Sequence, residues 1–341
     1  MRRGKAAIQG ISSYLPDRKL TNAQLAEEFG DWDAAKILDK TGIAVRSIAA
    51  ADECASDLGV AAATRLFESG ACSATDVDFL LFCTQSPDYI MPTTACLLQD
   101  RLGLRTDCGG MDFNLGCSGF VYGLALAKGL IEAGTAANVL LITAETYSKF
   151  INPRDRSVRT IFSDGAAATF INSVDSDEQL IGPFVFGTDG SGGQEVVIPA
   201  GGLRCPLNAE SAIEKEDQSG NWRSERNLYM NGPEVFNFAI RTVPRAIEQL
   251  LGKWGRGMDE VDYFIFHQAN RFMLEHLRNK LKIPPDKFWI DLENYGNTVS
   301  STIPIALESA KKMGAIRVGD NVAVIGFGVG YSWGAAMVRI S

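Results

Sequence analysis

Histidine is scarce in this chain, with only two among 341 residues. Two imidazoles and scattered cysteines offer no plausible metal site, and we expect neither a metal nor another cofactor. No run of 18 apolar residues occurs, so we expect no membrane span. The net charge of −8 argues against nucleic acid as the main partner, because binding to phosphates requires an excess of basic side chains.

Cysteine is present, but its pattern does not indicate disulfides. The seven cysteines are odd in number and lack paired close spacing, which favours a reducing cytoplasm. Met1 to Lys5 is basic, but the stretch from Ile8 to Leu15 is too short and polar for a signal peptide. We therefore expect a cytoplasmic protein. Because 46% of its residues are hydrophobic, the chain is able to bury a full core.

One histidine lies in the run His267-Gln268-Ala269-Asn270, directly after the apolar stretch 261–266. That stretch predicts a buried strand. Enzymes built on parallel sheets keep their chemistry at the ends of such strands. A lone histidine is more often a core imidazole held by hydrogen bonds, so His267 alone does not establish a site.

Cys117 is the second candidate. It lies between Gly116 and Ser118, before an apolar pattern that predicts a buried helix ending near Gly134. The partial positive charge at a helix N-terminus stabilises a thiolate, so we expect a lowered pKa for this thiol. The alternative is a buried structural cysteine. That alternative suits the other six cysteines, which are Cys54, Cys72, Cys83, Cys96, Cys108 and Cys205.

The segment 294–304 holds a third candidate, Asn297. Its asparagines precede an apolar helix pattern, and turns of this kind often serve only as helix caps. A neutral amide beside a neutral imidazole has another use, because both can donate hydrogen bonds to an enolate oxygen. Cys117, His267 and Asn297 come from distant stretches and together form a nucleophile with an enolate-stabilising pair.

The chain also contains an internal repeat. Residues 77–83 resemble 261–267 at an offset of 184, and residues 138–142 resemble 321–325 at an offset of 183. Gly116-Cys117 falls opposite Gly296-Asn297 at an offset of 180. Three matches in one order at nearly one offset predict two copies of one α/β unit. The repeat would place Cys117 and Asn297 at equivalent helix starts, and Cys83 opposite His267.

With the segments 10–16, 41–43 and 333–339, these motifs resemble the β-ketoacyl-acyl-carrier-protein synthase III family over nearly the whole length. The resemblance implies an α/β, thiolase-like five-layer αβαβα fold of two duplicated halves. Residues 1–175 would carry Cys117, and residues 176–341 would carry His267 and Asn297. It also implies a homodimer in which these three residues form the catalytic triad.

The implied reaction has two stages and needs no cofactor. Cys117 attacks the thioester of an acyl-CoA or acyl-carrier donor, and the backbone N–H groups of Cys117 and Val329 form the oxyanion hole. A malonyl group on an acyl carrier protein then loses CO2. His267 and Asn297 hydrogen-bond the enolate, whose carbon attacks the acyl group on Cys117. The glycine run 326–334 fits this oxyanion loop and not a nucleotide loop, because a strand and not a helix is predicted after it.

Substrate contacts follow from the same resemblance. Arg156 matches an arginine that stacks on the adenine of CoA, but Lys36 stands where the family has the opposing tryptophan. Trp32 lies four residues earlier and is a candidate substitute from the next helical turn. Met91 matches a residue that reaches across the dimer to limit acyl length. Other positions assigned to the substrate tunnel are Phe162, Leu228, Gly232, Phe236 and Asn270.

An acidic carrier needs a basic docking patch. Candidates on the predicted helix after the His267 motif are Arg271, Arg278, Lys280 and Lys282, although an ordinary solvated face would look the same. The family has an arginine two residues past the asparagine of His-Gln-Ala-Asn. Here that position is Phe272, and the neighbouring Arg271 points about 100° away around a helix. We therefore expect an altered carrier contact.

The stretch 201–227 looks roughly fifteen residues longer than in housekeeping members of the family, and its polar composition predicts a loop. It is either a surface insertion or a lid over the acyl entrance. With the altered CoA and carrier contacts, it suggests a specialised paralogue.

Three other functions share part of this pattern. A non-decarboxylating acyltransferase, passing the acyl group from Cys117 to an alcohol or amine, shares the nucleophile and stays open. A hydroxymethylglutaryl-CoA-synthase-like enzyme needs a carboxylic acid/base, and Asp78, Glu145 and Asp164 do not match its motif. A non-catalytic partner subunit would lack the nucleophile that this chain retains.

Overall fold

Two five-stranded sheets with the same strand order form the frame of the chain, whose computed structural model describes residues 4–341. The basic residues Arg2 and Arg3, with Met1, lie outside the described part. The first sheet runs β1 (Lys5–Tyr14), β7 (Gly165–Val174), β6 (Asn138–Glu145), β4 (Phe79–Cys83) and β5 (Gly109–Phe113). The second runs β8 (Ile181–Thr188), β16 (Ser332–Arg339), β15 (Asn321–Gly328), β13 (Tyr263–Phe266) and β14 (Phe288–Trp289).

The strand register confirms the internal repeat. Phe79 of β4 pairs with Val139 of β6, and Tyr263 of β13 pairs with Val322 of β15, both in parallel ladders. Both pairs are related by the offsets of 184 and 183 found in the sequence. In each half the same two strands, β4 and β6 or β13 and β15, are flanked by an antiparallel strand. β7 ends at Val174 and β8 begins at Ile181, so each sheet belongs to one half of the chain.

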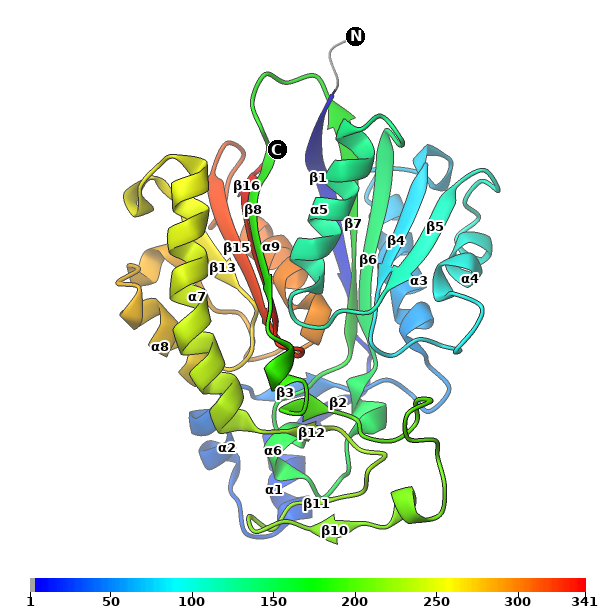
Figure 1. Cartoon of the computed structure of the whole chain (residues 1–341), viewed down its shortest axis with the longest axis vertical. Helices are drawn as coiled ribbons and strands as arrows, with labels where there is room; N and C mark the ends of the chain where they lie inside the picture. Colours follow the sequence, from blue (N-terminus) through cyan, green and yellow to red (C-terminus); the bar gives the residue numbers. More distant parts are fainter. Residues whose placement is uncertain (1–3) are drawn as a thin grey trace.

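Helices on either side of the sheets complete five layers, which lie side by side in Figure 1. The outer layer on the first sheet is α3 (Ala55–Glu68) with α4 (Thr94–Arg101), and that on the second is α7 (Gly232–Trp254) with α8 (Arg271–Lys280). The central layer is α5 (Gly119–Glu132) with α9 (Thr302–Lys312). Side chains of α5 and α9 form one buried cluster with the inner faces of both sheets, and the outer helices form separate clusters.

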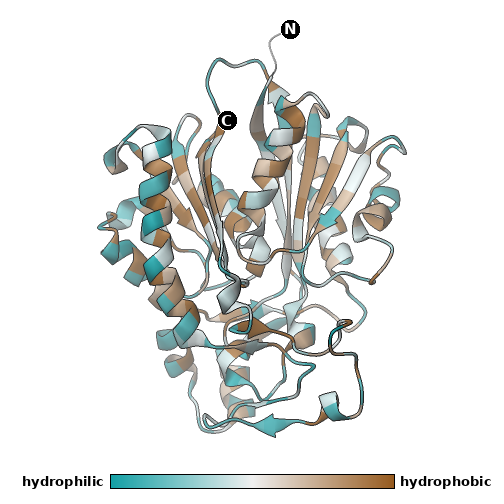
Figure 2. Cartoon of the chain, in the orientation of Figure 1, coloured by the Kyte–Doolittle hydropathy of each residue, from teal (hydrophilic) through white to brown (hydrophobic). Residues whose placement is uncertain are grey.

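The central helices are apolar because both sides of their layer are covered. In Figure 2 the strands and α5 are largely hydrophobic, whereas much of α7 and the lower end of the molecule are hydrophilic. Two hydrogen bonds cross between the halves inside this apolar layer. The Ser118 and Ser332 hydroxyls lie 2.6 Å apart, and the Thr143 and Ser301 hydroxyls lie 2.9 Å apart. Ser118 precedes α5 and Ser301 precedes α9, so these two serines occupy equivalent positions in the repeat, whereas their partners lie on β16 and β6, which are not equivalent strands.

The remaining segments gather at one end of the sheets, at the bottom of Figure 1. Within residues 4–341, no helix is long and apolar enough to cross a membrane, and no cluster of three or more acidic, His or Cys side chains is arranged to hold a metal. The elements at this end are β2 (Lys19–Thr21), α1 (Asn22–Phe29), α2 (Ala34–Thr41), β3 (Val45–Ser47), α6 (Arg156–Arg159), β9 (Val196–Val197), β10 (Lys215–Glu216), β11 (Trp222–Arg223) and β12 (Tyr229–Met230).

Three local predictions are wrong. Lys282 is not on the helix after the His267 motif, because α8 ends at Lys280 and Lys282 has the left-handed φ of 56°. Trp32 is not one helical turn from Lys36, because α2 begins at Ala34 after its cap Asp33. The stretch 201–227 is not all loop, since β10 and β11 form an antiparallel hairpin within it.

Candidate active site

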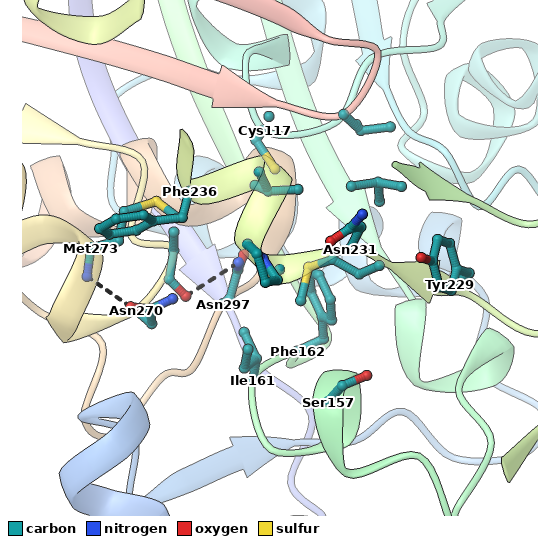
Figure 3. Close-up of a pocket in the computed structure, with 18 of the residues that line it drawn as sticks. Cys117, Ser157, Ile161, Phe162, Tyr229, Asn231, Phe236, Asn270, Met273 and Asn297 are labelled. Carbon is teal, nitrogen blue, oxygen red and sulfur yellow. Dashed lines mark hydrogen bonds between the residues drawn. The ribbon is translucent and has the colours of Figure 1, made fainter. Parts of the chain in front are cut away.

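The three candidate catalytic side chains meet in one cavity at the ends of the central strands. His267 directly follows β13, Cys117 lies two residues before α5, and Asn297 precedes the short turn that leads into α9. All three line a cavity of about 600 Å³, together with Val329 at the end of β15. Figure 3 shows Cys117 and Asn297 facing the same space as Phe162 and Asn231.

The environment of the Cys117 thiol is apolar. It packs against a cluster that includes Tyr147, Phe162 and Val299. Burial raises the pKa of Cys117 to about 12, so the prediction of a lowered pKa is wrong. Desolvation destabilises the charged thiolate by more free energy than the positive end of α5 stabilises it. The resting nucleophile is therefore a protonated thiol.

Two backbone N–H groups point at the Cys117 sulfur. The amides of Val329 and of Cys117 itself both hydrogen-bond the thiol and oppose the rise of its pKa. The approach is close because β15 ends in glycine: a Cβ on Gly328 would lie 2.8 Å from the Cys117 sulfur, and one on Gly326 would lie 2.7 Å from the Cys117 carbonyl oxygen. Two converging amides are the arrangement that stabilises an oxyanion.

His267 is almost fully enclosed, with 2% of its surface exposed. Burial lowers the pKa of its imidazole to about 3, so the ring is neutral at physiological pH. Nδ1 lies 2.7 Å from the Thr302 hydroxyl, and the ring also hydrogen-bonds the Val299 backbone carbonyl. A neutral imidazole has one nitrogen to accept and one to donate a proton, which suits acid–base work without a fixed charge.

Asn297 is fixed by its backbone and by its side chain. Its backbone N–H donates to the Ile161 carbonyl, and Phe162 and Asn297 form a parallel β-bridge. The side-chain oxygen accepts a 2.9 Å hydrogen bond from the Val299 N–H, which identifies the other amide atom as the nitrogen. That nitrogen donates a long bond of 3.4 Å to the Ala269 carbonyl, drawn in Figure 3. The NH2 group is therefore directed into the cavity region beside His267.

A buried acid, Glu145, lies behind the nucleophile at the end of β6. It accepts hydrogen bonds from the Gln85 N–H at 3.0 Å and the Ser300 hydroxyl at 2.9 Å. Burial nevertheless raises the pKa of Glu145 to about 8. Glu145 does not line the cavity, and the one carboxylate among the described lining residues is Asp217, which pairs with Arg223 at 2.8 Å. The site thus offers no unpaired carboxylate for hydroxymethylglutaryl-CoA-synthase-like acid–base chemistry.

The predicted substrate residues divide into two groups. Phe162, Gly232, Phe236 and Asn270 line the cavity, although the side-chain oxygen of Asn270 is used to cap α8 through the Met273 N–H. Leu228 is buried in the wall behind them. The others lie outside the cavity lining, and they are Met91, Arg156 and Trp32.

Arg156 and Trp32 lie together near the cavity, next to its lining residue Ser157. The Arg156 guanidinium is 5.7 Å from the Trp32 ring centre and forms an ion pair with Asp31 at 2.6 Å. Lys36 and Lys40 approach the same indole at 5.3 and 4.8 Å. This cluster combines an aromatic face with three cations, as nucleotide phosphates and bases require.

The insertion 201–227 is docked against the cavity and does not form a loose lid. Its residues Asp217, Ser219, Asn221 and Arg223 line the cavity. Arg223 donates to the fully buried Asp155, the cap of α6, at 2.7 Å. The Asn221 side-chain oxygen accepts from the first backbone N–H of α6 at 3.1 Å. These bonds fix the hairpin as a wall of the entrance.

The residues predicted for carrier docking differ in whether they already bind another group of the chain. Arg271 pairs with Glu293 at 2.8 Å, and Arg278 donates to the Ile283 carbonyl at 3.3 Å. Lys280 instead lines a second groove, of about 350 Å³, between α8 and α7. The other basic residues of that groove, Arg241 and Arg245, were not singled out by the sequence.

Sequence reasoning also missed several lining residues. Tyr147 and Met273 line the cavity and carry no motif that would mark them. Thr302 was visible as part of the segment 294–304, but its contact with His267 depends on the turn between them. The hairpin residues had a signal, because Asp-Gln-Ser-Gly-Asn at 217–221 is typical of a turn.

Comparisons with known proteins agree along the whole chain. A family model described as 3-oxoacyl-[acyl-carrier-protein (ACP)] synthase III matches residues 111–190, and the model of its C-terminal part matches residues 251–340. A β-ketoacyl-[acyl-carrier-protein] synthase III of Caldanaerobacter subterraneus subsp. tengcongensis is 38% identical over 336 residues, 98% of each chain.

Solved structures give the same result. A crystal structure of a 3-oxoacyl-(acyl-carrier-protein) synthase III is 53% identical, with a TM-score of 0.98 over 98% of this chain and 100% of that chain. A 3-oxoacyl-(acyl-carrier protein) synthase from Burkholderia xenovorans LB400 is 34% identical, with a TM-score of 0.91 over 100% and 95% of the two chains.

Proposed function

This chain belongs to the β-ketoacyl-[acyl-carrier-protein] synthase III family, and from that membership and the cavity geometry we propose which residues carry each stage of its reaction. The protein is an acyltransferase of the condensing type, with the thiolase fold. The observation that carries the residue assignment is the meeting of Cys117, His267 and Asn297 in one cavity.

In the first stage, Cys117 attacks the thioester carbon of an acyl-CoA or acyl-carrier donor. The proton of the thiol must leave as the carbon–sulfur bond forms, because the pKa of about 12 leaves little thiolate at neutral pH. The N–H groups of Cys117 and Val329, which already face the sulfur, would hold the oxyanion of the tetrahedral intermediate. Collapse of that intermediate releases the donor thiol.

In the second stage, a malonyl group on an acyl carrier protein enters the same cavity. Loss of CO2 leaves an enolate, which needs hydrogen-bond donors but no full positive charge. The Asn297 amide and the neutral imidazole of His267 are suited to this role, since both are buried and fixed by backbone contacts. The enolate carbon then attacks the acyl group on Cys117 and gives a β-ketoacyl thioester.

Release of CO2 tests this assignment. We expect purified protein, loaded with an acyl-CoA, to release one CO2 from malonyl-carrier for each β-ketoacyl product. A non-decarboxylating acyltransferase would transfer the acyl group to an alcohol or amine with no CO2. Measuring 14CO2 and product together, with acyl-loaded enzyme lacking malonyl-carrier as the control, distinguishes the two. Product without CO2 would contradict the condensing reaction.

We assign donor entry to the end of the cavity formed by α6 and the insertion. The cluster of Arg156, Trp32, Lys36 and Lys40 is suited to the nucleotide of an acyl-CoA. In the structure the Arg156–Trp32 separation of 5.7 Å is too small to hold a base between the two groups. Binding of adenine between them would require Arg156 to leave Asp31. This altered contact and the docked hairpin are what support a specialised paralogue.

We place carrier docking on the groove between α7 and α8, lined by Arg241, Arg245 and Lys280. All three are exposed, and the groove begins at Asn237, the residue after the cavity-lining Phe236. Between the groove and the cavity, Phe272 is 62% exposed and stacks on Phe236, with 5.4 Å between the ring centres. A basic groove beside an apolar entrance is complementary to an acidic carrier that presents its arm to the cavity.

Charge reversal tests the docking groove. Arg241→Glu with Arg245→Glu is expected to raise KM for malonyl-carrier about tenfold or more and to leave kcat nearly unchanged, because steering depends on these charges. The same variant should use malonyl-CoA, which has no carrier, as well as the unmodified protein does. Arg256→Glu, just beyond the far end of α7, is the matched control. Equal KM effects of both reversals would place docking elsewhere.

We propose a homodimer formed through the edge of the first sheet. β5 is the edge strand, and its Met111 is 39% exposed. Tyr89, Ile90 and Met91 are also exposed, with Met91 79% exposed, and they precede α4, whose Thr94 N–H donates to the Asp112 carboxylate of β5. A partner subunit paired with β5 would satisfy this unpaired edge and would bring Met91 of one subunit near the cavity of the other.

We also propose a cytoplasmic location. It is supported by the seven cysteines, which are all free thiols.

A further inference from the structure

The hydrogen bonds around His267 define which ring nitrogen carries the proton. The Thr302 hydroxyl donates to the Val299 carbonyl oxygen at 3.0 Å, so its single proton is already used. The Thr302 oxygen, 2.7 Å from Nδ1, can then only accept from the ring. The Val299 carbonyl, the second partner of the ring, has no proton to give. An accepting Thr302 oxygen requires a proton on Nδ1, which leaves Nε2 as an acceptor.

The same peptide unit also orients Asn297. Val299 has a φ of 55°, a left-handed conformation that is strained for a β-branched residue. In this conformation its N–H binds the Asn297 side-chain oxygen at 2.9 Å while its carbonyl faces Thr302 and the His267 ring. Val299, Thr302 and Ser301 are fully or almost fully buried, so water does not compete for these bonds. One strained turn thus sets the hydrogen-bonding direction of both partners of Cys117.

We propose that Thr302 is a positioning residue that holds His267 in the Nδ1–H form and so makes Nε2 the proton acceptor for the Cys117 thiol. This inference rests on the proposed function, because it assigns a direction to its first stage. The Cys117 S–H proton passes to Nε2 as the sulfur forms its bond to the acyl carbon. The carbon–sulfur bond of the donor then breaks, and the departing thiolate takes that proton from Nε2. Charge and protons balance without any other reactant.

A hydroxyl is suited to this position because it can also reverse its role. In the second stage, a hydrogen bond from Nε2 to the enolate requires the Nε2–H form, in which Nδ1 is an acceptor. The ring reaches this form between the stages by giving its Nδ1 proton to solvent and taking one from solvent on Nε2, so no net proton is gained or lost. The Thr302 hydroxyl can turn its proton from the Val299 carbonyl to Nδ1 without moving its oxygen. A methyl group in the same place can serve neither form. Without the Thr302 hydroxyl, the proton of the His267 ring is therefore expected to be distributed between Nδ1 and Nε2.

The scarcity of histidine makes the tautomer directly measurable. Selective 15N-histidine labelling gives two rings, and His276→Gln assigns the exposed one on α8. We expect His267 of the resting protein to show the Nδ1–H form, and to keep it in Thr302→Ser. Thr302→Val, which has the same shape without a hydroxyl, is expected to show a shifted or mixed tautomer. The Nε2–H form in the unmodified resting protein would overturn the proposal.

Rates of acyl-Cys117 formation provide the second readout. Thr302→Val is expected to slow acylation about tenfold or more, and Thr302→Ser to stay within about threefold of the unmodified protein, with equal thermal stability as the check on folding. Acylation of Thr302→Val within twofold of the unmodified protein would overturn the role of Thr302. Failure of the unmodified protein to form any acyl adduct would instead overturn the proposed function, and the NMR result would still decide the tautomer.

Discussion

Cys117→Ser is expected to leave no acyl adduct on the protein and to lower turnover by at least about 10³-fold, as removal of a nucleophile does in other covalent enzymes. A serine hydroxyl is a weaker nucleophile and a worse leaving group than a thiol. His267, with a pKa of about 3, is a weak base, and a serine hydroxyl holds its proton more tightly than a thiol does. The neighbouring acid Glu145 lies outside the cavity lining. The measurement is intact-protein mass after incubation with acyl-CoAs and acyl carriers of increasing length.

Cys96→Ser is the matched control. Cys96 is exposed, whereas the other six thiols are buried or partly buried, and it lies on α4, outside the cavity lining. It should acquire one acyl group as the unmodified protein does. An adduct of the same mass on Cys117→Ser would place the acyl group on another residue and contradict the assignment.

The pH dependence of Cys117 supplies a related readout. With a pKa of about 12, the thiolate fraction rises about tenfold for each pH unit between 6 and 9, so alkylation by iodoacetamide should rise over this whole range without a plateau. A thiol activated by the helix N-terminus would instead reach a plateau near neutral pH. The slope of the alkylation rate against pH therefore shows whether burial or the helix dipole has the larger effect on the pKa of Cys117.

Asn297→Asp is expected to suppress the second stage by about 10²–10³-fold, the usual cost of losing one donor to an oxyanion. Aspartate has the shape of asparagine but replaces the NH2 donor with a carboxylate, which repels the enolate in a buried site. The Val299 N–H can still bind one of its oxygens, so the turn should keep its conformation. Asn297→Ala, which removes the donor without adding charge, should be less impaired than Asn297→Asp.

The measurement is CO2 release from malonyl-carrier by enzyme that has already been acylated. Both Asn297 variants should still take up the acyl group on Cys117, because the oxyanion amides come from Val329 and Cys117. Decarboxylation by Asn297→Asp at the unmodified rate would exclude Asn297 from enolate stabilisation. Failure of acylation in both variants would indicate that Asn297 supports the first stage instead.

Much of the architecture was predictable because apolar periodicity is a strong signal in buried elements. The strands at 79–83 and 263–266, the helix at 119–132 and the duplication all follow from the pattern of apolar residues and its offset. The five-layer arrangement itself came from the family resemblance. Lys282 and Trp32 were placed wrongly because helix boundaries depend on caps and left-handed residues that periodicity does not reveal.

The chemistry of the site was less predictable, since pKa values depend on what surrounds a group in space. The helix start before α5 is visible in the sequence, but the apolar cluster of Tyr147, Phe162 and Val299 around Cys117 is not. The groove of Arg241, Arg245 and Lys280 was missed for a similar reason, because it joins two helices. The anchoring of the hairpin by Asp155 requires contacts between residues 68 positions apart.

The two hydroxyl bonds that cross between the halves, Ser118 to Ser332 and Thr143 to Ser301, have a meaning for the ancestry of the chain. A single ancestral unit would carry one helix start and one strand end, and could build this centre only by pairing with a second copy of itself. Two identical copies must place the same residue on both sides. A fused chain has no such constraint. The predicted equivalence of Cys117 and Asn297 is wrong, because the offset of 183 that relates α5 to α9 places Cys117 opposite Ser300. The offset of 184 places His267 opposite Cys83, so corresponding positions of the two halves carry different chemical groups.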